Sequence, residues 1–234
     1  MLWIKTNHIN TTHGFSMRHG GISPAPFESL NLGGSEDFPE NIAENRRRAL
    51  EELGIAFGQV SYLNQIHSNL VCEANIGKQT GDALVTNQTG IAIAVGAADC
   101  YPILFHDEKN HVIGAAHCGW KGTITRIVTN TINEMHRLGA DINHIKVAIG
   151  QGISAKNYEV SEEVIEQFKQ NGFPDTCWSG RHLNLLRANQ FVMEENGILP
   201  ENIWSMNRCT TESDFFSYRR DKGQTGRMWG IIML

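Results

Sequence analysis

The sequence predicts a mixed α/β fold built as a single domain over residues 1–234. Three observations support this: helical runs with apolar residues at steps of three and four, short β-rich runs, and the alternation of the two along the chain. With 234 residues, of which 41% are hydrophobic, the chain can bury a sizeable core. No low-complexity tract, Pro-rich linker or fixed repeat divides it, so we expect one compact unit.

The helices are predicted from periodicity and from capping residues. Over residues 39–53 the apolar positions share one face, Pro39 suits a first turn, and Gly54 suits a C-terminal cap. Further helices are expected over residues 121–138, after Ser161 as N-cap, and over residues 184–196.

Short β-rich runs between the helices are predicted as strands. The segment 111–149 has the order strand, turn, helix, strand, which is the order of a βαβ unit. His117 would then lie at the carboxyl end of its strand, where open α/β sheets place their ligand crevices. The predicted strands span residues 60–65, 83–86, 91–95, 102–106, 111–118, 145–149, 215–218 and 228–233.

Composition argues against several classes of protein. The chain has 25 acidic and 20 basic residues, and its net charge of -5 offers no basic surface for nucleic acid. Its longest apolar run, at residues 90–98, is about half of the roughly 20 residues that span a bilayer, so no membrane segment is expected. The first residues lack the features of a secretory signal, and the five cysteines form no CxxC pair. We therefore expect a cytoplasmic protein with reduced thiols.

Three short segments place possible metal ligands where an apolar strand ends. They contain His67, Cys100 and His117, each close to small residues that allow the backbone to approach. Zinc binds imidazole and thiolate, and three protein ligands leave one tetrahedral position for water or substrate, as in catalytic sites. Taken singly, a histidine near a strand end is more often hydrogen-bonded in the core, and a cysteine is more often a small buried hydrophobe. Spacing alone therefore leaves the metal site as a hypothesis.

A set of longer motifs is spread over nearly the whole chain. They are MRHGGIS at 17–23, PFESLNLG at 26–33, QIH at 65–67, GDALVT at 81–86, ADC at 98–100, AHCGWKG at 116–122, YEV at 158–160, CT at 209–210, FFSYRR at 215–220 and TGRM at 225–228. Together they resemble the YfiH/LACC1-like family. Its members were first called multicopper polyphenol oxidases or laccase-domain proteins, and later purine nucleoside phosphorylases.

The resemblance implies both a fold and an activity. The fold is a four-layer α/β/β/α sandwich with mixed sheets, carrying a Zn²⁺ site whose ligands match His67, Cys100 and His117. The activity is phosphorolysis of adenosine, inosine, guanosine and methylthioadenosine, with adenosine deamination in addition. The partners are then purine nucleosides and inorganic phosphate.

The chain departs from the family pattern at two places. Residues 150–153 are GQGI where relatives commonly carry GPCI, which weakens any role for a second active-site cysteine. Lys121 replaces the usual arginine after the tryptophan. The lysine keeps the positive charge but lacks the forked geometry that binds phosphate through two hydrogen bonds.

The implied chemistry needs groups that move protons. Cys100, His117, Asp82 and Asp99 are the candidate catalytic residues, with the two carboxylates as possible general bases. An equally good interpretation of Asp82 is a turn residue whose carboxylate accepts hydrogen bonds from nearby backbone N–H groups. An equally good interpretation of Asp99 is a hydrogen-bond acceptor for the ring N–H of a metal-bound histidine, which would orient that histidine.

Phosphate also needs a cationic cradle. Arg18, Lys121, Arg219 and Arg220 are the candidates, and the turn at residues 119–122 would add backbone N–H groups at a helix N-terminus. Each arginine taken alone fits a solvated surface charge equally well.

Three other hypotheses remain open from the sequence. A thiol hydrolase would use Cys100 as nucleophile with His117 or His67 as base. Copper redox chemistry is less favoured than zinc because the histidines form no His-x-His pair. A zinc-stabilised binding module would need a fourth ligand such as Cys118, although neighbouring strand residues point to opposite faces. The sequence favours no particular oligomeric state.

Overall fold

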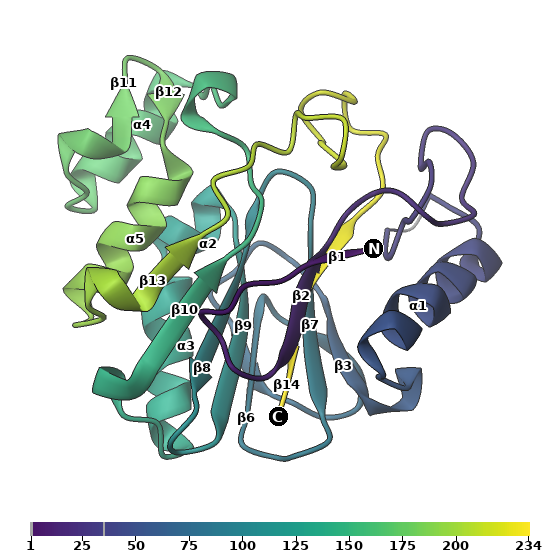
Figure 1. Cartoon of the computed structure of the whole chain (residues 1–234). Coiled ribbons are helices and arrows are strands. Elements are labelled where there is room, and N and C mark those ends of the chain that lie inside the picture. Colours follow the sequence, from purple (N-terminus) through teal and green to yellow (C-terminus); the bar gives the residue numbers. More distant parts are fainter. Residues whose placement is uncertain (1, 35) are drawn as a thin grey trace.

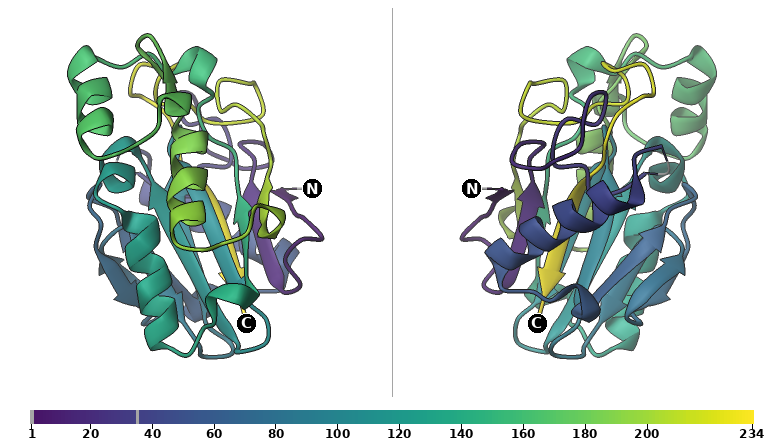
Figure 2. Two further views of the ribbon diagram at one scale, coloured as in Figure 1. Left: turned by 90° about the vertical axis from the view of Figure 1, so that its left-hand side faces the viewer. Right: turned by 90° about the vertical axis from the view of Figure 1, so that its right-hand side faces the viewer.

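The computed structural model describes residues 2–34 and 36–234 as two six-stranded sheets packed face to face, with helices on the outer face of each (Figures 1 and 2). Each sheet contains parallel and antiparallel neighbours. The result is the four-layer α/β/β/α sandwich with mixed sheets that the resemblance implied. Within the described residues, no helix is long and apolar enough to cross a membrane.

Each sheet combines strands from distant parts of the chain. The first contains, in spatial order, β1 (Trp3–Ile4), β2 (Thr12–Ser16), β14 (Met228–Met233), β7 (Ala92–Ala97), β3 (Val60–Asn64) and β5 (Gly77–Thr80). The second contains β13 (Ile203–Ser205), β10 (Ile145–Ile149), β8 (Tyr101–Asp107), β9 (Val112–Cys118), β6 (Ala83–Thr86) and β4 (Val71–Glu73). A separate ribbon pairs β11 (Trp178–Ser179) with β12 (His182–Leu183).

Helices cover the two outer faces. The helix α1 (Pro39–Leu53) packs on the first sheet through Ala49 and Leu50. The second sheet is covered by α2 (Trp120–Ile124), α3 (Ile127–Arg137) and α5 (Leu185–Glu195), and α4 (Glu162–Gln170) adds Ile165 and Phe168 to the same core (Figure 2). Helices α1, α4 and α5 confirm the predictions for these segments.

The central strands are apolar on both faces because each face meets another layer. In β8, Ile103 and Phe105 belong to the core beneath the helices, whereas Leu104 belongs to the core between the sheets. In β7, Ala94 packs toward α1, and Val95 packs between the sheets. Side chains of a strand alternate between faces, so a strand buried on both sides appears as a continuous apolar run.

One predicted helix is divided in the structure. Residues 121–138 form two helices, α2 and α3, because Arg126 has a φ of 65° and breaks the helical path. The Thr125 hydroxyl bonds back to the carbonyl of Lys121, and the Thr125 carbonyl accepts a hydrogen bond from Asn69 Nδ2. Such side-chain competition for backbone groups bends or ends helices. The prediction of one continuous helix was wrong.

The strand predictions were right for the apolar runs and failed elsewhere. The predicted βαβ unit exists, since β9 and β10 run parallel, but antiparallel β8 lies between them. Residues 215–218 form a loop instead of a strand, because Phe215 and Phe216 fill a small core with Met228. Several short strands, among them β4 and β5, were not predicted.

Phe15 fills the space between the sheets next to two glycines, so Gly150→Ala tests how tightly this layer is packed. A methyl group at residue 150 would lie 2.4 Å from Phe15 Cδ1 and 2.9 Å from Pro102 Cγ. We expect the free energy of unfolding to fall by about 1–3 kcal/mol, measured by urea denaturation.

Gly58→Ala is the matched control, because no atom lies within 4 Å of the new methyl group. It should be neutral or stabilise the protein by up to about 1 kcal/mol, since alanine restricts the unfolded chain. Equal stability of the two variants would show that the layer has more free space than the structure indicates.

Candidate active site

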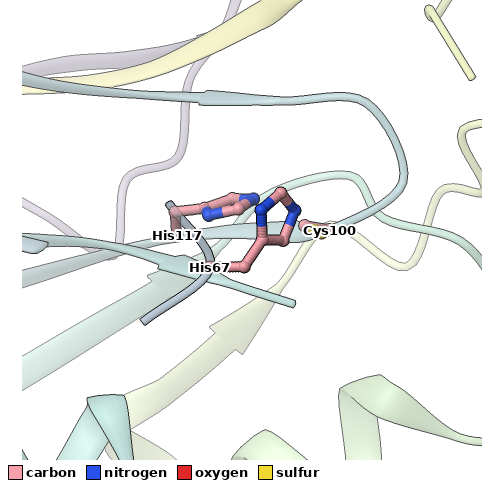
Figure 3. A group of neighbouring side chains, drawn as sticks. All are labelled: His67, Cys100 and His117. Carbon is pink, nitrogen blue, oxygen red and sulfur yellow. The ribbon is translucent and has the colours of Figure 1, made fainter. Parts of the chain in front are cut away.

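The structure brings His67, Cys100 and His117 together (Figure 3). The three ligand atoms, one imidazole nitrogen from each histidine and Cys100 Sγ, lie within 4.8 Å of one another. Among the described residues, no other group of three histidine, cysteine or acidic side chains meets this criterion. Two imidazoles and a thiolate at this separation can hold a metal ion, and they match the donor preference of zinc.

The topology explains why these residues meet. Cys100 comes directly before β8, and His117 lies near the end of β9, its antiparallel neighbour, so both are at the same edge of the second sheet. His67 follows the end of β3 in the first sheet. The site therefore lies where the ends of both sheets meet.

The backbone of the site adopts uncommon conformations. His67 has a φ of 57°, and Asp99, directly before Cys100, has a φ of 92°. Positive φ is rare for residues other than glycine and tends to occur at functional sites. Gly119 also makes space, because a Cβ there would lie 2.8 Å from Cys100 Sγ.

Asp82 is fully buried and connects two of the ligands. Its carboxylate accepts hydrogen bonds from the backbone N–H groups of His67 (3.1 Å) and Ser68 (2.6 Å), and from His117 Nδ1 (2.9 Å). The bond from Nδ1 leaves His117 Nε2 free as a ligand atom. Burial alone would raise the pKa of Asp82, but the hydrogen bonds from His117 and Ser68 lower it to about 2.

Asp99 makes a different set of contacts. Its carboxylate accepts hydrogen bonds from Thr210 Oγ1 (2.6 Å) and from the backbone N–H of Arg219 (2.7 Å). These bonds tie the C-terminal loops to the segment that holds Cys100. The orientation of a ligand histidine, which the sequence suggested for Asp99, is provided by Asp82 instead.

Cys100 and His117 form a charged pair. Burial alone would raise the pKa of the Cys100 thiol, but the charge and hydrogen bonds of His117, with a contribution from His67, lower it to about 6. Burial would lower the pKa of His117, but Cys100 and Asp82 raise it to about 9. Cys118 lies in the core beneath the helices, on the opposite face of β9, and burial raises its pKa. It is therefore not placed to act as a fourth ligand.

The three ligands line a cleft of about 1190 Å³ that extends to α1. Ligand pockets are commonly about 300–1,000 Å³, so the cleft has room for more than one small molecule. Its walls carry aromatic side chains, among them Trp120, Tyr158 and Tyr218.

The predicted phosphate-binding residues divide into two groups. Lys121 and Arg219 line the cleft. Arg18 and Arg220 are not among the lining residues: Arg18 lies over the ring of Phe216, and Arg220 forms an ion pair of 2.7 Å with Asp221.

The sequence analysis did not single out three arginines that line the cleft, Arg46, Arg47 and Arg227. Arg47 is paired with Glu44, whereas Arg46 and Arg227 form no ion pair within the described residues. Arg46 lies within a run of three arginines on the polar side of α1, which is typical of a solvated helix face. Arg227 does stand in the TGRM motif, and that motif was the available signal.

Asp82→Asn tests the role of the buried carboxylate in holding the ligands. The asparagine side chain would place an NH₂ group where Asp82 now accepts hydrogen bonds from N–H groups. At least one of these bonds would be lost, so His67 and His117 should be held less firmly. We expect the affinity for Zn²⁺ to fall about 10–100-fold, measured by competition with a chromophoric chelator.

Asp107→Asn is the control, because this carboxylate is also fully buried and accepts backbone hydrogen bonds from Asn110 (3.0 Å) and Asp141 (2.7 Å), but it lies at the end of β8 opposite Cys100. It should leave zinc affinity unchanged. Equal losses in both variants would contradict the role given to Asp82.

Solved structures share this architecture over the whole chain. YlmD from Geobacillus stearothermophilus is 28% identical with a TM-score of 0.93, and the match covers 99% of this chain and 98% of that one. The Neisseria meningitidis protein NMB0706 is 31% identical with a TM-score of 0.90, covering 100% and 99%.

Sequence comparison gives named relatives. A purine nucleoside phosphorylase from Deinococcus radiodurans is 44% identical, covering 99% of this chain and 92% of that protein. A purine nucleoside phosphorylase from Corynebacterium glutamicum is 38% identical, covering 94% and 93%. The family described as multi-copper polyphenol oxidoreductase laccase matches residues 12–234. The chain belongs to this family, together with the YfiH and YlmD proteins.

Proposed function

We propose that this chain is a zinc-dependent purine nucleoside phosphorylase that acts on adenosine, inosine, guanosine and methylthioadenosine, and that also deaminates adenosine. The observation that supports this most directly is a single cleft that joins the His67, Cys100 and His117 group to several cationic side chains. The names of the most similar relatives point to the same reaction.

Zinc is the metal that best fits the donor set. Two imidazoles and one thiolate suit this borderline-soft ion and leave one coordination position open. Bound there, zinc would lower the pKa of a coordinated water to near neutrality and polarise a substrate group. A multicopper centre needs several clustered histidines. Within the described residues, the only candidate metal-ligand group contains two.

In phosphorolysis, a phosphate oxygen bonds to C1′ of the ribose while the bond from C1′ to N9 breaks. The purine leaves with the electron pair and takes up a proton, giving free base and ribose 1-phosphate. The cationic side chains that line the cleft would neutralise the phosphate. In deamination, water adds at C6 and the amino group leaves as ammonia with a proton.

The two carboxylates suit different roles in this chemistry. Asp99 lines the cleft, so it is the better candidate to accept or return a proton at the purine. Asp82 is not among the lining residues and would act by holding His117. Trp120 and Tyr158 offer flat surfaces for the purine, and stacking of a base on an aromatic side chain contributes about 1–3 kcal/mol.

A chromatographic screen of nucleosides with and without phosphate tests the function. Free base should form only when phosphate is present, and His117→Ala should lower the rate by at least about 100-fold, because it removes a ligand and a proton carrier. His144→Ala is the control, since His144 precedes β10 at the end of the sheet opposite Cys100. Failure of the wild-type protein to convert any nucleoside would refute the proposal.

A cysteine hydrolase is the second candidate, because Cys100 Sγ lies within 4.8 Å of both imidazoles and either could act as its base. Complete metal removal separates the two candidates. The zinc enzyme should lose activity with a chelator and regain it when Zn²⁺ is restored. Activity that survives metal removal but disappears on alkylation of Cys100 would favour the hydrolase.

A further inference from the structure

Two partly buried arginines lie at the end of the cleft next to α1. A Cβ at Gly33 would lie 3.7 Å from Arg227 Cβ and 4.0 Å from Arg46 Nη2, so both side chains lie close to this glycine. Both side chains line the cleft that contains Cys100. The two arginines come from distant parts of the chain, α1 and the segment before β14.

Within the described residues, neither arginine forms an ion pair. Arg47 and Arg48, the next residues of α1, form ion pairs of 2.8 Å and 2.7 Å with Glu44. Among the described residues, no carboxylate lies within 4.0 Å of the guanidinium of Arg46 or Arg227. Arg46 and Arg47 both line the cleft, and within the described residues only Arg46 of the three arginines forms no ion pair.

Both guanidinium groups are held in place by neutral groups. Arg46 Nε donates to the Leu32 carbonyl (2.8 Å), and its guanidinium lies over the rings of Tyr62 and Trp229, 4.7 Å and 4.8 Å from their centroids. Arg227 Nη1 donates to the carbonyl of Thr225 at 2.8 Å. The pair is thus ordered before any ligand arrives, which reduces the entropy cost of binding.

A buried polar network supports the pair from behind. Asn31 Oδ1 accepts hydrogen bonds from the backbone N–H groups of Gly33 (3.1 Å) and Arg227 (2.8 Å). Asn45, the neighbour of Arg46 in α1, donates to the Asn31 carbonyl at 3.0 Å. Asn31 therefore connects the glycine and both arginines, and this gives a structural role to the PFESLNLG and TGRM motifs.

The charges of this pair are poorly compensated. Burial lowers the pKa of both guanidinium groups, although Tyr62 offsets part of the effect at Arg46, and the charges of Cys100 and Asp99 do so at Arg227. A cation that is partly removed from water and has no partner costs free energy. An anion that binds between the two arginines would recover this cost through charge-assisted hydrogen bonds.

We propose that Arg46 and Arg227 form an oxyanion subsite that binds the phosphate co-substrate in the space left by Gly33. Two planar guanidinium groups can each hold a tetrahedral oxyanion through paired hydrogen bonds. Lys121 and Arg219 suit this task less well, because both are exposed and solvent screens their charges. The identity of the anion rests on the proposed phosphorylase function.

Steady-state kinetics on the zinc-loaded protein tests the subsite. Arg46→Met and Arg227→Met should each raise the KM for phosphate about 10–100-fold, the effect of losing one charge-assisted contact, and leave the KM for the nucleoside unchanged. Arg→Lys at either position should give a smaller rise, because the charge stays and the fork is lost. Arg48→Met is the matched control, as it removes a charge from the same helix outside the cleft. An unchanged KM for phosphate in both methionine variants would overturn the subsite.

Direct binding separates the subsite from the reaction. Calorimetric titration of the zinc-loaded protein with inorganic phosphate, without nucleoside, should show binding that both methionine variants lose and Arg48→Met keeps. If no nucleoside is converted but this pattern holds, the subsite stands without the phosphorylase. If phosphorolysis proceeds and phosphate binding is independent of both arginines, the phosphorylase stands without the subsite.

A purine nucleoside 5′-monophosphate is the second probe, because its phosphoryl group has the same chemistry. The proposal expects inorganic phosphate to bind on its own and to compete with this probe. Arginine-dependent binding of the monophosphate without any binding of inorganic phosphate would assign the subsite to a nucleotide and overturn the assignment to a co-substrate.

Discussion

The geometry of the site depends on one buried charge, the carboxylate of Asp82. It accepts hydrogen bonds from the turn after β3, which belongs to the first sheet, and from His117 of β9, which belongs to the second. A buried carboxylate is tolerated only while its hydrogen-bond donors stay in place, because the unpaired charge would cost several kcal/mol. The same interaction therefore joins the two sheets and holds two of the three candidate metal ligands.

The sequence predicted those parts of the fold in which local pattern and tertiary packing agree. The apolar positions of α1 in the sequence match its buried face, and α5 lies within the segment 184–196 that was predicted as a helix. The division between α2 and α3 was missed, because neither the positive φ of Arg126 nor the contact of the Thr125 carbonyl with the distant Asn69 has a signal in the apolar pattern. Strands such as β5 were missed because a short polar edge strand has no pattern of its own, and its neighbour determines the pairing.

The candidate site, like the fold, was predictable only in part. Residue type and position at strand ends made His67, Cys100 and His117 candidates, but it was the resemblance to a known family that selected them as metal ligands. The role of Asp82 stayed undecided because its donors come from separate segments of the chain. Arg46 was missed for a related reason: within a run of three arginines, only tertiary packing determines which one forms no ion pair with Glu44 and lies over Tyr62 and Trp229 instead.

The arrangement of the cleft explains how one site could serve both proposed reactions. Deamination occurs at C6 of the purine and phosphorolysis at C1′ of the ribose, and these atoms lie on opposite sides of a nucleoside. The candidate metal ligands, Asp99 and the two arginines line the same cleft, and Arg46 and Arg227 lie close to Gly33. A nucleoside against the aromatic walls would present C6 to the candidate metal ligands and C1′ to an anion held by the arginines. Under the proposed function, the two activities then require one binding orientation and no second site.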